Sequence, residues 1–126
     1  MTDRPRLQHV AATFPAGRGD DLRRFYAGPL GLAEMAVPEE VAHLGWIWFS
    51  TREPGVELHF IPHDIAPDPA RAHHFCLEVD DIAAVRDALE AAGAATRPAG
   101  QRIVGRERLF VRDPVGNLVE VVELSR

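Results

Sequence analysis

The chain has 126 residues, which is the length of one ordinary domain. Its 46% hydrophobic and 26% charged residues allow a buried core, and its net charge of -5 argues against nucleic acid or an anionic membrane as the main partner. No apolar run is long enough for a membrane helix, and no signal-peptide pattern opens the sequence. The single cysteine, Cys76, rules out an internal disulfide and suits a reducing compartment, so the sequence predicts a cytoplasmic protein.

The first half of the sequence predicts one helix among four strands. Residues 6–14 form the first strand, and residues 19–32 form a short helix that Asp20 or Asp21 caps and that Gly28 and Pro29 break. Three further strands are expected at residues 33–37, 45–50 and 56–61. The proline-rich stretch that follows cannot be a helix or a central strand, so it is interpreted as a linker.

The second half repeats this order. Residues 73–79 predict a strand, and residues 80–93 predict the clearest helix, which Asp80 or Asp81 caps and Gly93 ends. The apolar stripe of this helix consists of Ile82, Val85, Leu89 and Ala92. Strands are then expected at residues 93–98, 106–112 and 118–124, with a turn at DPVGN before the last.

Both halves therefore read strand, helix and three strands, which indicates an internal repeat. The Asp20–Leu22 sequence DDL recurs as DDI at Asp80–Ile82. The prediction is an α+β fold of paired βαβββ modules in a single domain, residues 1–126. Module one covers about 6–62, the linker about 63–71, and module two about 72–126.

Strand alternation brings three possible metal ligands forward. His9 and His74 both lie opposite the face on which each module's helix is expected to pack. Glu120 shares a face with Leu118 and Val122, where a carboxylate is costly to bury unless it is paired or bound to a cation. Two histidines and a carboxylate on different strands form a plausible metal constellation.

Each of these residues also has a plainer interpretation. A lone strand histidine is more often a surface or satisfied core residue, and Glu120 could face solvent on an edge strand. The remaining histidines are expected at a strand start or in loops: His73, His43 and His63. The aromatic cluster is interpreted chiefly as core, with a substrate pocket as the alternative: Trp46, Trp48 and Phe49. The joint arrangement across the repeat favours the metal interpretation.

Five segments resemble the glyoxalase/bleomycin resistance/dioxygenase group, the vicinal oxygen chelate (VOC) superfamily. They read QHVAAT, LRRFYAGPLGL, VELHF, HHFCLEVDDIAAVRDALEAAG and LFVRDPVGNLVEVVE. The pair FYAGPLGL and DPVGNLVEVVE is specific for the superfamily but not for one activity within it. The resemblance implies two βαβββ modules whose mixed sheet curls into a cup around the site, often in a homodimer.

The resemblance also implies a set of metal ligands, namely His9, Glu57, His74 and Glu120. Without Glu57, the remaining three resemble the two-histidine, one-carboxylate triad of extradiol dioxygenases. His59 lies on the same strand face as Glu57, so the fourth ligand is open between them. Glu57 is favoured because with Glu120 it neutralises a divalent cation, while His59 and Trp48 are assigned to the substrate pocket. The implied metal is Ni, Co, Zn, Mn or Fe.

The function favoured by this reasoning is a glyoxalase-like, metal-dependent lyase or isomerase. The metal would chelate adjacent oxygens of a small-molecule substrate and stabilise an enolate or oxyanion, with Glu120 or Glu57 carrying a proton. One alternative is an Fe(II) extradiol-type dioxygenase, and another is a drug-binding protein of the bleomycin-resistance kind, without catalysis. The expected partners are a small molecule and a second copy of the chain.

Overall fold

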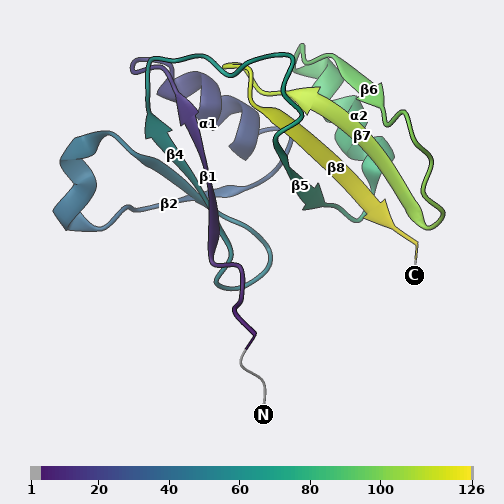
Figure 1. Ribbon diagram of the computed structural model, residues 1–126, viewed down its shortest axis with the longest axis horizontal. Coiled ribbons are helices and arrows are strands. Elements are labelled where there is room, and N and C mark those ends of the chain that lie inside the picture. The colour runs from purple at the N-terminus through teal and green to yellow at the C-terminus, as the bar shows by residue number, and fades with distance from the viewer. Residues whose placement is uncertain (1–3, 126) are drawn as a thin grey trace.

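The computed structural model describes residues 4–125 as two four-stranded sheets (Figure 1). The first sheet has the strand order β1 (His9–Phe14), β4 (Glu57–Pro62), β3 (Ile47–Ser50) and β2 (Ala33–Met35). The second has the order β5 (His74–Glu78), β8 (Leu118–Leu124), β7 (Arg106–Arg112) and β6 (Thr96–Pro98). The helices are α1 (Gly19–Ala27), the 3₁₀ helix η1 (Glu39–Leu44) and α2 (Ile82–Ala91). We call these sheets the N-sheet and the C-sheet.

The two sheets repeat one topology, as the sequence predicts. β1 pairs with β4 in parallel and β5 pairs with β8 in parallel, and the other pairings are antiparallel. The α+β prediction of paired βαβββ modules is therefore confirmed. Within the described chain β1 and β5 are edge strands of separate sheets, so His9 lies on one sheet while His74 and Glu120 lie on the other.

The helix boundaries follow local chemistry. Asp81 caps α2 by accepting a hydrogen bond from the Ala84 N–H at 3.0 Å, as predicted. The predicted aspartate cap of α1 is wrong, because Arg18 occupies that position and makes no side-chain cap. The Asp21 carboxylate instead pairs with Arg18 and Arg24.

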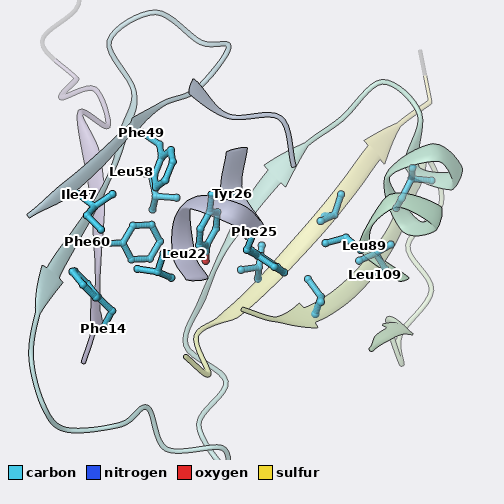
Figure 2. Close-up of a cluster of buried hydrophobic side chains, with 14 residues drawn as sticks. Phe14, Leu22, Phe25, Tyr26, Ile47, Phe49, Leu58, Phe60, Leu89 and Leu109 are labelled. Carbon is cyan, nitrogen blue, oxygen red and sulfur yellow. The ribbon is translucent and has the colours of Figure 1, made fainter. Parts of the chain in front are cut away.

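One core connects the two modules. α1 lies between the sheets in Figure 1, and Figure 2 shows its aromatic side chains reaching toward both. Leu22 and Tyr26 are fully buried in this cluster, while Leu89 of α2 packs in it from the C-sheet side. Ala92, predicted to complete the apolar stripe of α2, is exposed because the helix ends at Ala91.

A buried polar network joins the modules beside this core. The Tyr26 hydroxyl donates to Asp113 Oδ2 at 2.7 Å, and the Asn117 side chain donates to both Asp113 Oδ2 and the Thr13 carbonyl oxygen. Burial raises the pKa of Asp113 above its usual value, against the opposing effect of the hydrogen bonds from Tyr26 and Asn117. Residues of the predicted DPVGN turn thus fix the position of one module against the other.

Other parts of the sequence prediction need correction. His43, which the sequence places in a loop, lies in the 3₁₀ helix η1. The residues of the aromatic cluster differ in burial. Phe49 is core, whereas Trp48 on the opposite face of β3 and Trp46 just before this strand are half-buried. In the described residues no helix is long and apolar enough to cross a membrane. The cytoplasmic location stays a prediction.

Candidate metal centre

The N-sheet presents four of the predicted site residues on one face. His9 is in register with Glu57 across the parallel β1–β4 pair, and Trp48 is in register with His59 across the antiparallel β3–β4 pair. The opposite face carries Val10, which packs against the core. The predicted orientation of His9, away from the helix-packing side, is therefore the one observed.

Glu57 and His59 contact each other directly. His59 Nε2 donates to Glu57 Oε1 at 2.8 Å, and this bond is the main reason that the pKa of Glu57 lies below its usual value. Gln8 adds a second hydrogen bond to Glu57, and Gln8 Oε1 also accepts from His9 Nδ1. Glu57 is therefore held as an oriented carboxylate, and His9 keeps Nε2 free to act as a ligand.

The aromatic rings on this face form a stack. Trp48 lies over His59 with ring centroids 3.7 Å apart and planes 3° from parallel, and His59 lies over His9 at 4.1 Å and 17°. Nitrogen lone pairs point outward in the plane of an imidazole ring. Two nearly parallel, stacked imidazoles therefore cannot both aim a lone pair at one ion between them, which favours a single histidine ligand on this sheet.

The C-sheet presents a second pair of donors. Cys76, the strand neighbour of His74 on the same face, is in register with Glu120. His74 Nε2 lies 2.9 Å from Glu120 Oε1, and Arg108 contacts the other carboxylate oxygen at 3.3 Å. Glu120 is nearly buried, so Arg108 supplies the paired charge that its position requires.

The hydrogen bonds of His74 fix the chemistry of its second nitrogen. Nδ1 lies 2.7 Å from the Ala72 carbonyl oxygen, which can only accept, so Nδ1 carries a proton. A neutral ring then places the Nε2 lone pair against a carboxylate oxygen, which repels it unless a proton or a cation lies between them. Ligands at right angles on one ion, each about 2.1 Å away, are about 3 Å apart. The pair is therefore within hydrogen-bond distance, and two ligands of one metal ion would have a similar spacing.

Within residues 4–125, the donors do not gather into one group. No three histidine, cysteine, aspartate or glutamate side chains in this part of the chain are placed to hold a metal ion. Glu57 and His74 instead line a common cleft of about 940 Å³ between the sheets. One chain thus supplies two donor pairs of suitable chemistry: the N-pair, His9 and Glu57, and the C-pair, His74 and Glu120.

The remaining candidates are less well placed. Three further histidines are exposed: His73, His43 and His63. Burial raises the pKa of the Cys76 thiol to about 12, with the Glu120 charge adding to the shift, so the thiol stays protonated near neutral pH. Cys76 is therefore a poor nucleophile.

Arg108 is the site residue that sequence reasoning missed. The signal was present in RERLFVR, because alternation along β7 puts Arg106, Arg108 and Phe110 on one face. Antiparallel pairing places Glu120 opposite Phe110, and therefore diagonal to Arg108. Using this signal requires the register of β7 against β8, which the sequence of neither strand predicts by itself.

Solved structures share this fold. A glyoxalase family protein from Bacillus anthracis is 27% identical, with a TM-score of 0.85 over 99% of this chain and 100% of its own. A Streptomyces antibiotic binding protein (17% identity, TM-score 0.72, 99% and 100% coverage) and the fosfomycin resistance protein FosX of Listeria monocytogenes (13% identity, TM-score 0.76, 94% and 91% coverage) share the fold alone. Comparison with curated protein sequences found no match.

The family assignment rests on the sequence as a whole. The model of the Glyoxalase/Bleomycin resistance protein/Dioxygenase superfamily matches residues 6–121, which include both modules and all four candidate ligands. The match agrees with the repeated topology and with the resemblance seen in the sequence. The chain belongs to the Glyoxalase/Bleomycin resistance protein/Dioxygenase superfamily.

Proposed function

We propose that the protein is a metal-dependent, glyoxalase-like lyase or isomerase that acts on a small molecule with two adjacent oxygens. Its ligands are His9, Glu57, His74 and Glu120, and a homodimer assembles each centre from the N-pair of one chain and the C-pair of the other. A divalent ion bound there would act as a Lewis acid toward the substrate oxygens.

The spacing and tautomer of the C-pair carry the proposal. His74 Nε2 and Glu120 Oε1 lie 2.9 Å apart with Nδ1 already used as a donor, which suits two ligands of one ion. The full donor set of two imidazoles and two carboxylates suits Ni, Co, Zn, Mn or Fe, and its two negative charges balance a divalent cation.

The split between the pairs supports assembly across two chains. His9 and His74 are both exposed, and they lie on different sheets of the same chain. Both would need to lie within about 2 Å of one metal ion to bind it. β1 and β5, which carry them, are edge strands of the described sheets, and open edges are commonly covered by a partner. A two-fold dimer that joins β1 of one chain to β5 of the other would bring both pairs together and cover both edges.

Each pair then has a residue that could carry a proton. Glu57 is an ionised carboxylate held by His59, and Glu120 is held by Arg108, so either could accept a proton from the substrate if it leaves the metal. Trp48 borders the N-pair, and its indole Nε1 is buried without a hydrogen-bond partner among the described residues. The position of the Trp48 ring beside the N-pair supports a substrate-binding role for this residue.

The test is metal analysis of the purified and metal-reconstituted protein. The proposal expects about one divalent ion per chain and the mass of a dimer in light scattering. Glu57→Ala should weaken metal binding more than His59→Ala, which should act mainly on substrate handling. Failure to bind Ni, Co, Zn, Mn or Fe stoichiometrically would sink the metal-dependent function.

A second candidate is a non-catalytic protein that sequesters a small molecule. The specific observation in its favour is the cleft of about 940 Å³, whose walls include Leu7, Val10, Leu32 and Phe75. This volume lies within the range of about 300–1,000 Å³ that is usual for small-molecule sites. A related fold belongs to the Streptomyces antibiotic binding protein. Ligand binding that is equal in metal-free and metal-loaded protein would favour this candidate.

A further inference from the structure

A second cavity lies at the start of β7, and we call it the arginine cavity. Its volume is about 420 Å³, and its walls come from the β6–β7 loop, β7, α2 and the segment after β8. Four of its lining residues are arginines: Arg86, Arg102, Arg106 and Arg108. Glu107 is the only acidic residue among those that line it.

The charges of this cavity are not internally balanced. Arg86 approaches Glu107 at 3.8 Å, and Arg108 pairs with Glu120 at 3.3 Å. Within residues 4–125, neither Arg102 nor Arg106 has a carboxylate partner within 4.0 Å. Two arginines that have no carboxylate partner among the described residues therefore line one cavity of a protein whose net charge is -5. Such a concentration attracts an anion and can bind its oxygens with paired N–H groups.

The cavity adjoins the candidate metal centre through Arg108. One guanidinium nitrogen of Arg108 contacts Glu120, and the other donates to the Gln101 carbonyl oxygen in the cavity wall. Arg106 lies two residues before Arg108 on the same face of β7. A ligand held by Arg102 and Arg106 would thus lie toward the β7 start of the C-sheet, with Arg108 between it and the C-pair.

We propose that the arginine cavity binds an oxyanion group of the substrate, namely a carboxylate, phosphate or phosphonate. The identification of the anion as part of the substrate rests on the proposed function, whereas the anion site itself depends only on the cavity and its arginines. Arg102 and Arg106 hold the charged group, and this fixes the uncharged part of the molecule toward the metal centre. The substrate class is therefore an anionic small molecule with two adjacent oxygens elsewhere in its structure.

The anion site can be tested with inorganic phosphate on metal-free protein, by titration calorimetry at low ionic strength. A hydrogen bond to a charged group contributes enough for the double variant Arg102→Ala/Arg106→Ala to weaken phosphate binding by about tenfold or more. The double variant Arg71→Ala/Arg97→Ala is the matched control, because it removes the same charge outside the cavity. It should change the affinity by less than about twofold, a small effect of long-range charge under salt screening.

Other anions and a charge-preserving variant distinguish the possible results. Methylphosphonate and acetate, titrated in the same way, distinguish a tetrahedral from a planar oxyanion. Arg102→Lys/Arg106→Lys keeps the charge and should recover part of the affinity, which shows that loss in the alanine variant is not misfolding. The proposal is overturned if the wild type does not bind any of the three anions, or if both alanine double variants weaken binding equally. The metal content of the wild type is measured separately. If the wild type binds an anion but no metal, the proposed function is rejected and the anion site is retained.

Discussion

The N-pair and the C-pair occupy equivalent places in two modules of one topology, yet their carboxylates are held differently. Glu57 is partly exposed and takes its hydrogen bond from His59, whose ring is itself stacked on Trp48. Glu120 is nearly buried and has an arginine as well as a histidine against it. The two modules therefore direct their ligands in the same way, but different neighbouring side chains hold the carboxylate in each module.

The largest expected effect is at the buried carboxylate. Arg108→Met leaves Glu120 with His74 as its remaining partner, and loss of a hydrogen bond to a charged group at such a site costs up to about 3 kcal/mol of unfolding free energy. Arg106→Met is the matched control, because it makes the same change on the same strand face at an exposed residue and should cost less than about 0.5 kcal/mol. Urea denaturation of both metal-free variants measures the difference. Equal losses would remove the distinction between the two carboxylates.

The junction that holds the two pairs in place is expected to have an intermediate effect. Tyr26→Phe removes the hydroxyl that donates to Asp113 Oδ2 without changing the shape of the ring. Because Asn117 still donates to the same oxygen, the loss should be about 1–2 kcal/mol in a urea denaturation measurement. Unchanged stability would mean that the contact between modules does not depend on this network.

The smallest expected effect concerns the pKa of Glu57. His59→Ala removes the hydrogen bond that mainly lowers it, so the pKa should rise toward 4.5, as followed by NMR of the carboxyl carbon. A lowered pKa in the folded state means that Glu57 stabilises the fold above pH 4.5, and that this contribution is lost as pH falls through the folded-state value. The variant should therefore lose less stability in that acidic range. Glu120 serves as the internal control, and an unchanged Glu57 signal would contradict the assigned contact.

Much of the fold could be predicted because its signals are local. The β7 and β8 bounds are those expected, since alternating apolar residues end at turn chemistry on both sides. The α1 cap failed because the sequence offers Asp20 and Asp21 as caps, while Arg18 and Arg24 compete for the Asp21 carboxylate. The strands that carry His9, His74 and Glu120 were found, but their division between two sheets depends on tertiary pairing. Neither Arg108 beside Glu120 nor the arginine cavity is visible without that pairing.

The central claim is that an N-pair and a C-pair from different chains make one metal centre. His9→Ala and His74→Ala protein should each bind little metal, but unfolding them together and refolding gives mixed dimers. A mixed dimer then contains one intact centre and one that lacks both histidines. The control mixture of His74→Ala with Glu120→Ala always places a damaged C-pair in every centre.

The decisive measurement is the metal content of these two mixtures after reconstitution, determined by emission spectrometry. Random pairing makes about half of the His9→Ala/His74→Ala dimers mixed, and the account predicts about one ion per mixed dimer, while the control mixture binds no more than its parent variants. The opposite result is that neither mixture binds more metal than its parent variants, although each refolds to a dimer and the wild type binds metal. That result would place the complete centre within one chain.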